Sequence, residues 1–240
     1  MSIYTIGDLH LSFHENKPMG IFGENWEGHE EKIKNNWIEK VKENDLVILP
    51  GDFSWSTYLK DTYEDFEYLN SLPGKKVLLK GNHDYWWTTL TSMRNFLKEN
   101  NFKDIDFIYN NAYEFENTII AGTRGWSQTE EGENQKLLKR EAARLELSLQ
   151  EAIELKSNVE NSVENKEIIV FMHYPPITNS NVNNNEMNEF IQIIKKYDIK
   201  RCYYAHLHGA SIKDAIEGEY FGIDFKLVSA DGLDFKLLKI

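Results

Sequence analysis

The chain of 240 residues is poor in cysteine, in long apolar runs and in basic side chains. Its one cysteine, Cys202, excludes an internal disulfide and fits a reducing compartment. Because Cys202 lies within an apolar run, a buried inert thiol is favoured over a nucleophile. Nowhere do eighteen apolar residues follow one another, and the first residues show neither a basic stretch nor a signal-cleavage site. We therefore expect a cytoplasmic protein that is neither secreted nor inserted in a membrane.

The charge balance is strongly acidic. The chain has 27 lysines and arginines against 39 aspartates and glutamates, a formal net charge of −12. Proteins that wrap nucleic acid need basic side chains to neutralise phosphates, so this class is not expected. A small anionic substrate is still compatible, because two bound divalent cations would add about four positive charges at one place.

The composition does not divide the chain into parts. No Pro-, Gly- or Ser-rich stretch separates two halves, so we expect a single domain over residues 1–240. The 13 phenylalanines, 12 tyrosines and 6 tryptophans supply apolar surface for one core despite the polar average.

Short apolar runs predict buried strands. The five main runs are residues 3–6, 46–49, 77–79, 168–172 and 202–205, and weaker candidates lie at 107–109, 112–115 and 118–121. Helical spacing of apolar residues predicts helices at 30–42, 63–72 and 89–100. Strands joined by helices indicate an α/β fold whose sheet is covered on both faces, with ligands bound beyond the carboxyl ends of the strands.

The second half of the chain carries three further predictions. Residues 135–159 have apolar side chains at helical spacing among charged ones, which predicts one long amphipathic helix. A lid or the contact face of a homo-oligomer is one interpretation of it, and a covering helix with a solvated side is the simpler one. Residues 179–185 are expected to form a polar loop that shapes specificity. Residues 220–228 and 235–240 are expected to pair as an antiparallel hairpin at a sheet edge.

A polar fragment follows each of the five main runs. The fragments are Gly7-Asp8-Leu9-His10, Gly51-Asp52, Gly81-Asn82-His83-Asp84, Met172-His173 and His206-Leu207-His208. Five of the seven histidines lie in these fragments, and only His14 and His29 lie elsewhere. Any one of these histidines alone would more often be an ordinary core or surface residue. Together the fragments predict a metal site at the strand ends.

The fragments contain enough donors for two metal ions. The candidate ligands are Asp8, His10, Asp52, Asn82, His173, His206 and His208. Mixed carboxylate and imidazole donors suit Mn, Fe or Zn better than Mg or Ca. One metal needs three or four protein ligands, so the set serves two if one carboxylate bridges them. Two metals about 3.5 to 4 Å apart can clamp a phosphoryl group and generate hydroxide at neutral pH, which predicts phosphoester hydrolysis.

The ordered series Asp-x-His, Gly-Asp, Gly-Asn-His-Asp, His and His-x-His resembles the calcineurin-like metallophosphoesterase family over most of the chain. The resemblance implies a four-layer α/β/β/α sandwich of two mixed sheets. It also implies the ligand sets: Asp8, His10 and His208 for the first metal, Asn82, His173 and His206 for the second, and Asp52 as the bridge. A hydroxide bridging the metals would then attack phosphorus in line.

The same resemblance leaves His83 free of metal. In the family this histidine interacts with the substrate phosphoryl group and is proposed to protonate the leaving oxygen, and the adjacent Asp84 would orient its ring. Outside the fragments, Arg124 is a candidate for binding a substrate phosphate, with a surface ion pair as the alternative. His14 is a further candidate for a hydrogen bond near the metals or the substrate.

Some residues depart from the pattern of the family. Ala205 stands where a glycine often precedes His-x-His, which alters backbone freedom but removes no ligand. Residues 53–55, Phe-Ser-Trp, differ from the continuation in protein Ser/Thr phosphatases and in purple acid phosphatases. Lys80 and Asp84 stand where protein phosphatases have Arg and Glu. These differences favour the bacterial-type branches that act on small molecules or diesters.

The leading hypothesis is therefore a dinuclear metal-dependent phosphohydrolase that cleaves a small phosphomonoester or phosphodiester. A metal-binding scaffold of the same fold without catalysis is the alternative, although no ligand is missing. The aromatic residues 85–87 pack in the core or stack on a base. Nothing in the sequence selects the substrate, because monoesters, nucleotide diesters and lipid-linked pyrophosphates present similar phosphoryl groups.

Overall fold

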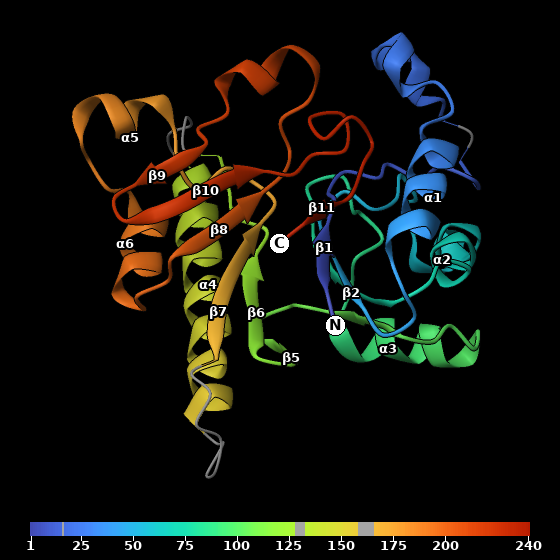
Figure 1. The fold of residues 1–240 in the computed structure, drawn as a ribbon, viewed down its shortest axis with the longest axis horizontal. Helices are drawn as coiled ribbons and strands as arrows, with labels where there is room; N and C mark the ends of the chain where they lie inside the picture. The colour runs from blue at the N-terminus through green and yellow to red at the C-terminus, as the bar shows by residue number, and fades with distance from the viewer. Residues whose placement is uncertain (16, 128–132, 158–165) are drawn as a thin grey trace.

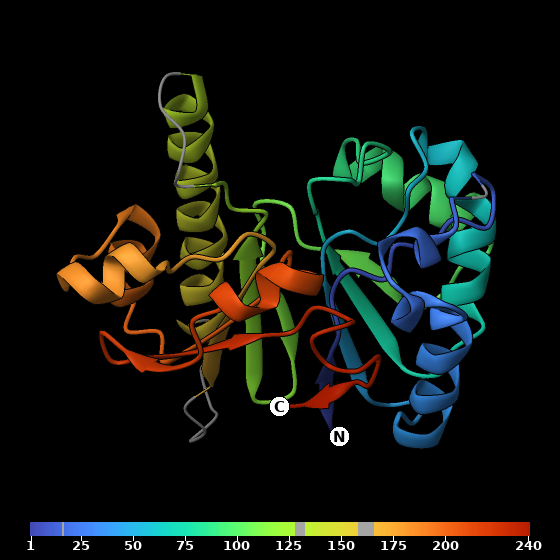
Figure 2. The same cartoon turned by 90° about the horizontal axis from the view of Figure 1, so that it is seen from above.

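Two β-sheets lie at the centre of the protein, and helices cover the outer side of each (Figure 1). The computed structural model describes residues 1–15, 17–127, 133–157 and 166–240. Seen from above, the helices of the two halves lie on opposite sides of the paired sheets (Figure 2). The four-layer α/β/β/α sandwich of two mixed sheets predicted from the sequence is confirmed.

The first sheet contains the amino-terminal strands in the order β11-β1-β2-β3-β4. Its strands are β1 (Ile3–Thr5), β2 (Leu46–Pro50), β3 (Lys75–Leu79), β4 (Ile105–Phe107) and β11 (Leu238–Lys239). Strands β1 to β4 are parallel, and β11 is antiparallel to β1. Its helices are α1 (His29–Lys40), α2 (Tyr63–Asn70) and α3 (Leu90–Glu99) (Figure 1).

The second sheet has the order β5-β6-β7-β8-β10-β9. Its strands are β5 (Tyr113–Phe115), β6 (Thr118–Thr123), β7 (Glu167–Met172), β8 (Arg201–Tyr204), β9 (Gly218–Tyr220) and β10 (Ile223–Leu227). The four central strands are parallel, and the edge strands β5 and β9 are antiparallel to their neighbours. Its helices are α4 (Glu133–Ser157), α5 (Asn179–Asn184) and α6 (Glu189–Lys196).

Alternate residues of the central strands face different layers of the core. In β2, Ile48 points between the two sheets, whereas Val47 points toward the outer helices. In β7, Phe171 points between the sheets and Val170 toward α4 and α6. Because both faces of these strands are buried, the runs are apolar throughout rather than alternating.

The predicted helices lie within one or two residues of the observed ones. Thr89 is the N-cap of α3, and its hydroxyl accepts a hydrogen bond from the Ser92 N–H. The long helix α4 packs on the second sheet, as the covering-helix interpretation predicts. The end predicted for it, Val159, lies outside the described residues. Among the residues that the structure describes there are also four short 3₁₀-helices: η1 (Met19–Phe22), η2 (Glu24–Trp26), η3 (Leu59–Thr62) and η4 (Gly209–Asp214).

The polar loop predicted at residues 179–185 is instead the short helix α5. Thr178 and Asn181 form a capping box that begins the helix, and Asn185, with φ of 53°, ends it. Asparagine disfavours the interior of a helix but is common at helix ends. The polar composition of this segment therefore predicted a loop instead of a short helix. The amphipathic helix α6 was not expected either.

The hairpin predicted between residues 220–228 and 235–240 is wrong. Strand β10 pairs in parallel with β8 and, across the turn at Phe221-Gly222, antiparallel with β9. Strand β11 crosses to the other sheet and pairs with β1. Apolar pattern alone identifies a strand but not which free sheet edge accepts it.

No helix in the described part of the chain is both long enough and apolar enough to span a bilayer.

Candidate metal centre

The seven candidate ligands come from the carboxyl ends of neighbouring strands in both sheets. From the first sheet come Asp8 and His10 after β1, Asp52 after β2 and Asn82 after β3; from the second come His173 after β7 and His206 and His208 after β8. Parallel strands place their carboxyl ends at one edge of a sheet, and the two edges meet here. The structure therefore brings together residues up to 200 positions apart.

Several of these residues have left-handed backbone conformations. The φ angles are 57° for Asp8, 47° for His10, 52° for Asp52 and 75° for His206. Such angles are uncommon for residues other than glycine and persist where surrounding contacts hold them, often at functional sites. Here they turn the chain sharply after each strand and direct the side chains into one space.

Three ligands form a first group. His10 Nε2 lies 3.3 Å from His208 Nε2, and His208 Nε2 lies 3.3 Å from Asp8 Oδ1. The donor atoms of these three residues lie within 4.8 Å of one another. This is the set that the family resemblance implies for one metal ion.

Three other ligands form a second group. Asn82 Oδ1 lies 2.6 Å from His173 Nε2 and 2.9 Å from His206 Nδ1. His173 Nε2 and His206 Nδ1 are 3.2 Å apart. The set corresponds to the one implied for the second metal ion.

Asp52 lies between the two groups. Its Oδ2 is 3.7 Å from His10 Nε2 in the first group and 3.5 Å from His173 Nε2 in the second. Its Oδ1 accepts the backbone N–H of His83 at 2.8 Å, which fixes the orientation of the carboxylate. One side chain thus reaches both groups, as a bridging ligand must.

The buried charges at this centre fit bound cations. Burial, together with the neighbouring charges of Asp84 and Asp8, raises the pKa of Asp52 well above its ordinary value. Burial and nearby imidazoles lower the pKa values of His10 and His173. Asp8 Oδ1 is buried and faces two imidazoles, 3.3 Å from His208 Nε2 and 3.7 Å from His173 Nδ1. Neutral imidazoles facing buried carboxylates are the donor chemistry that a transition-metal ion needs.

Hydrogen bonds behind two histidines select the tautomer that binds metal. His173 Nδ1 contacts the Pro50 carbonyl oxygen at 3.1 Å and His208 Nδ1 contacts Asp231 Oδ1 at 2.9 Å. An Nδ1–H donated to these oxygens leaves Nε2 facing the candidate centre with a free lone pair. Burial lowers the pKa of His208, but the charges of Asp8 and Asp231 outweigh burial and raise the pKa to about 10. Without metal the His208 imidazole therefore holds a second proton, which a bound metal ion would displace.

Asp231 is a functional candidate that sequence reasoning missed. It lies between the two segments of the expected hairpin, and it accepts hydrogen bonds from His208 and from the Gly209 N–H at 2.8 Å. Its pKa is lowered because these hydrogen bonds outweigh the effect of burial. The available signal was an acid beside glycine near the end of the chain, which no spacing rule connects to His208.

His83 lies beside the first group and belongs to neither group. Its ring centroid is 5.7 Å from that of His10 and 4.4 Å from that of Trp55. Burial is the main cause that lowers its pKa, while the charge of Asp8 opposes the shift. Its Nδ1 is buried without a hydrogen-bond partner.

Asp84 has a different position from the one expected. Its carboxylate does not bond to the His83 ring; it accepts the backbone N–H groups of Gly81, Asp52, Phe53 and Ser54 and the Trp86 indole N–H, at 2.7 to 3.3 Å. Asp84 therefore holds together the two turns that carry Asp52 and His83. The expected role in orienting the His83 ring is corrected to one of positioning the backbone.

Two close contacts with neighbouring side chains explain why glycine stands at Gly7 and Gly81. A Cβ on Gly81 would lie 2.0 Å from Asp52 Oδ1, so only glycine lets these turns meet. A Cβ on Gly7 would lie 2.7 Å from the Cβ of Ala205. Ala205 stands where the family often has glycine. Its methyl group occupies the space that Gly7, which has no side chain, leaves free.

Arg124 follows β6, close to the turn that carries His173. Its backbone oxygen accepts the Tyr174 N–H at 2.8 Å, and its guanidinium donates to the buried Glu141 at 3.1 Å and lies over the Trp126 ring. The guanidinium is largely buried rather than at the surface, with a side-chain exposure of 12%. Its role in binding substrate stays a prediction.

The remaining candidates are His14 and the aromatic residues 85–87. His14 is exposed and is grouped with Glu15 and Asp61 rather than with the seven ligands. Trp86 and Trp87 are buried in the core of the first half, so the core interpretation applies to them, while Tyr85 is exposed. The aromatic triplet therefore offers no stacked platform.

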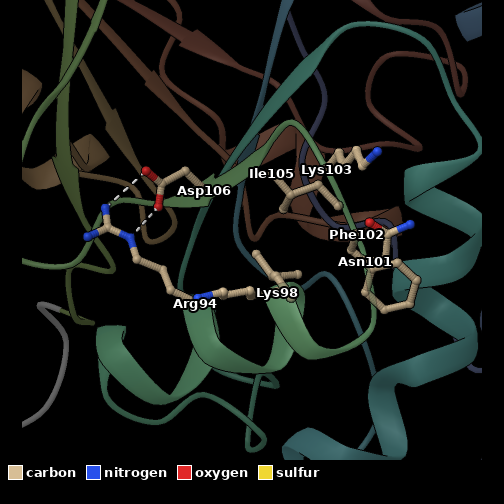
Figure 3. Close-up of a pocket in the computed structure, with 8 residues that line it drawn as sticks. Arg94, Lys98, Asn101, Phe102, Lys103, Ile105 and Asp106 are labelled. Atoms are coloured by element: carbon tan, nitrogen blue, oxygen red, sulfur yellow. Dashed lines mark hydrogen bonds and ion pairs between the residues drawn. The ribbon is translucent and has the colours of Figure 1, made fainter.

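A hollow elsewhere on the molecule contains no candidate ligand. It lies between α3 and β4, has a volume of about 410 Å³ and is open to solvent (Figure 3). Arg94 on its rim is held by Asp106 through two hydrogen bonds of 2.8 and 2.9 Å. Its basic groups are paired or exposed, and the metal centre remains the better candidate for chemistry.

The fold and the seven-residue centre define a metallophosphoesterase-like protein of the α/β/β/α class. The family model described as calcineurin-like phosphoesterase matches residues 1–210. The chain belongs to this family, whose members are typically metal-dependent phosphoester hydrolases.

Solved structures with the same fold share little sequence with this chain. The Thermus thermophilus protein TT1561 is 14% identical, with a TM-score of 0.56, covering 100% of this chain and 99% of its own. The Aquifex aeolicus protein AQ665 is 21% identical, with a TM-score of 0.51 and coverage of 99% and 95%. Phosphopantetheinyl hydrolase (PptH) from Mycobacterium tuberculosis is 12% identical, with a TM-score of 0.50 and coverage of 100% and 95%. At these identities the likeness shows the fold alone. No curated protein sequence matches the chain.

Proposed function

We propose that the chain is a two-metal phosphohydrolase that cleaves a phosphomonoester or a phosphodiester of a small molecule. The observation that carries the proposal is the division of seven ligands into two groups of three joined by Asp52. Two transition-metal ions, Mn, Fe or Zn by donor type, would polarise the phosphoryl group and lower the pKa of a water molecule beside it.

His83 is the proposed proton donor. Hydrolysis replaces the P–O bond to the alcohol with a P–O bond to the oxygen of water, and the departing alcohol oxygen takes up a proton. His83 is the one imidazole of the five fragments outside both ligand groups, and its ring adjoins the first group. Burial lowers its pKa, and a phosphate anion bound beside it would raise it again. The imidazole would therefore gain its proton as substrate binds.

The first experiment compares a chromogenic phosphate monoester with the matching diester, using protein stripped of metal and reloaded with Mn. We expect hydrolysis of at least one ester only after reloading. Hydrolysis of neither ester by protein that has bound two ions would contradict the proposal and favour the scaffold alternative.

Asp52→Asn tests the bridging ligand. An amide is a weaker ligand than a carboxylate, so we expect metal content by elemental analysis to fall below two ions and turnover to fall by roughly 10²-fold or more. Asp198→Asn is the matched control, since Asp198 has a similar φ of 55° but is 85% exposed. Full activity in Asp52→Asn would overturn the assignment.

His83→Ala tests the proton donor. Because His83 is not a ligand, the variant should bind two ions like the wild type while its kcat falls by roughly 10²- to 10⁴-fold. The loss should be smaller for an aryl ester, whose alcohol needs less protonation, than for an alkyl ester. Equal losses for both esters would contradict a role as general acid.

A further inference from the structure

A cavity of about 340 Å³ opens beside the first ligand group. Its lining contains the imidazoles of His10, His83 and His208. Its other side chains are apolar: Met19, Phe22, Trp26 and Trp55, with Gly209 and Ala210 completing it. We call this cavity the aromatic pocket. Its volume falls at the lower end of the range for small-molecule sites.

Aromatic contacts fix the walls of the pocket. The Trp55 ring stacks on His10, with centroids 4.8 Å apart and planes inclined by 22°. The Trp26 ring meets His10 and His208 edge-on, at 5.9 and 5.5 Å. The Trp55 indole N–H donates to the Met19 sulfur at 3.2 Å, so its one polar atom is already engaged. The walls are therefore pre-formed and apolar.

The lining selects against a polar occupant. Apart from the imidazoles and the Trp26 indole N–H, no side chain that lines the pocket presents an oxygen or a free nitrogen. A sugar with several hydroxyls would lose more hydrogen bonds to water than these few groups can replace. An apolar group would instead gain affinity, about fourfold for each buried methylene.

Two large apolar side chains stand at the mouth of the pocket, and Lys17 lies over the Trp55 ring with its Nζ 5.2 Å from the ring centroid. The 3₁₀-helix η1 carries Phe22, which lines the pocket and is 60% exposed, and Ile21, which does not line it and is 77% exposed. Large exposed apolar residues grouped at the edge of a pocket are typical of a ligand-binding surface.

A second cavity adjoins His206 of the second ligand group. It has a volume of about 760 Å³, and its lining mixes polar side chains such as Thr178 and Asn181 with apolar ones such as Ile177 and Leu207. His83 lines the aromatic pocket and does not line this second cavity. Since the proton donor must reach the leaving oxygen, the leaving group belongs on the side of the aromatic pocket.

We infer that the aromatic pocket binds the alcohol part of the substrate and that the protein selects phosphate esters of apolar alcohols over those of sugars or polyols. The inference rests on the proposed function and names its substrate class. The phosphoryl group lies at the ligand groups, the leaving oxygen faces His83, and the alkyl or aryl chain extends past Trp55 toward Phe22.

The first test compares kcat/KM for hexyl phosphate and glycerol 3-phosphate with the Mn-loaded protein. Glycerol is the better leaving group, so a preference for the hexyl ester reports binding and not intrinsic reactivity. We expect at least a tenfold preference for hexyl phosphate. Equal values, or a preference for glycerol 3-phosphate, would overturn the inference and leave the hydrolase proposal intact.

A second measurement does not need turnover. Calorimetric binding of methyl, propyl and hexyl phosphonate to the Mn-loaded protein should show Kd falling about fourfold per methylene until the pocket is filled. Chain-length dependence without hydrolysis of any ester would support the pocket and contradict the proposed function. Affinity independent of chain length would contradict the pocket.

Phe22→Ser and Ile21→Ser form a matched pair of variants on η1. Both residues are exposed, so neither change should disturb folding. Phe22→Ser removes part of the lining and should reduce the hexyl-to-glycerol ratio of kcat/KM several-fold. Ile21→Ser should leave that ratio unchanged. The same change in both variants, or in neither, would overturn the inference.

Discussion

Asp84 and Asp231 position the candidate ligands and belong to neither ligand group. Asp84 accepts five hydrogen bonds from the turns after β2 and β3, and Asp231 accepts one from His208 and one from the chain beside it. The N–H donors thus take the place of the water molecules that would otherwise hydrate each carboxylate. At the scale of single residues, the geometry of the centre depends on these two acids as much as on the donors they support.

Asp84→Asn should destabilise the fold strongly. The amide would turn one acceptor into an NH₂ group facing backbone N–H donors, in a site with no exposed surface. Leaving buried donors without acceptors should lower the free energy of unfolding by about 3 kcal/mol. Urea unfolding of the metal-free protein measures this. The exposed Asp198→Asn control should change it by less than about 0.5 kcal/mol.

Asp231→Asn should weaken metal binding with little loss of stability. If the amide oxygen keeps the Gly209 N–H, the amide NH₂ faces His208 Nδ1 and favours the tautomer whose Nε2 carries the proton. Metal affinity should then fall by roughly 10- to 100-fold, as titration of the metal-free protein would show. Asp234→Asn, at an 81% exposed side chain nearby, is the control. Unchanged affinity in Asp231→Asn would show that this hydrogen bond does not select the tautomer.

Helix α2 joins two of the loops that carry ligands. Its Asp65 is fully buried and accepts hydrogen bonds from the Phe13 N–H at 3.1 Å and from the Ser54 hydroxyl. Phe13 follows the turn of His10, and Ser54 follows Asp52. At the scale of elements, one side chain of the helix layer thus secures the loops after β1 and β2. Burial raises the pKa of Asp65 to about 6 because these two hydrogen bonds only partly compensate.

This raised pKa predicts how stability depends on pH. The folded protein holds the Asp65 proton more tightly than the unfolded chain, so this contribution is present at low pH and is lost as the pH rises from about 4 to 6. The Asp65→Asn variant has no carboxyl group to titrate at this position, so it should not show this loss of stability. Relative to the wild type, the variant should gain about 2 to 3 kcal/mol between pH 4 and pH 7, measured by urea unfolding without metal. If the two proteins differed in free energy of unfolding by the same amount at pH 4 and at pH 7, the raised pKa of Asp65 would be contradicted.

The two halves of the molecule meet at the metal centre. The first sheet contributes Asp8, His10, Asp52 and Asn82, and the second contributes the three other ligands. A shared apolar layer, which includes Ile48 and Phe171, also joins the sheets. At the scale of the whole molecule, ions bound to both ligand groups would link the sheets and stabilise the folded state over the unfolded one.

Metal removal should therefore lower the melting temperature. At a free Mn concentration about 100 times Kd, binding adds about 2.7 kcal/mol, which for a chain of this size corresponds to roughly 5 to 10 °C. The shift should be reversed by a chelator and be much reduced in Asp52→Asn, while Asp198→Asn keeps it. An unchanged melting temperature on adding Mn would contradict tight binding between the sheets.

The strands and the candidate ligands could be identified from the sequence because both depend on local pattern. A run such as 168–172 is apolar at every position since both of its faces are buried, and the polar fragment after it marks the strand end. Helix α5 escaped prediction because its asparagines favour loops as readily as helix ends. The aromatic pocket could not be predicted from the sequence either, because it combines residues from η1, the turn after β2 and the turn after β8.

The sequence by itself determined the fold class, the strand ends and the seven candidate donors, because apolar runs and donor types act over a few residues. The tertiary structure decided where β11 pairs and what Asp84 and Asp231 hold. These depend on contacts between segments far apart in the chain, such as the 23 positions between His208 and Asp231. Such contacts follow from how the two sheets pack, and no local pattern records them.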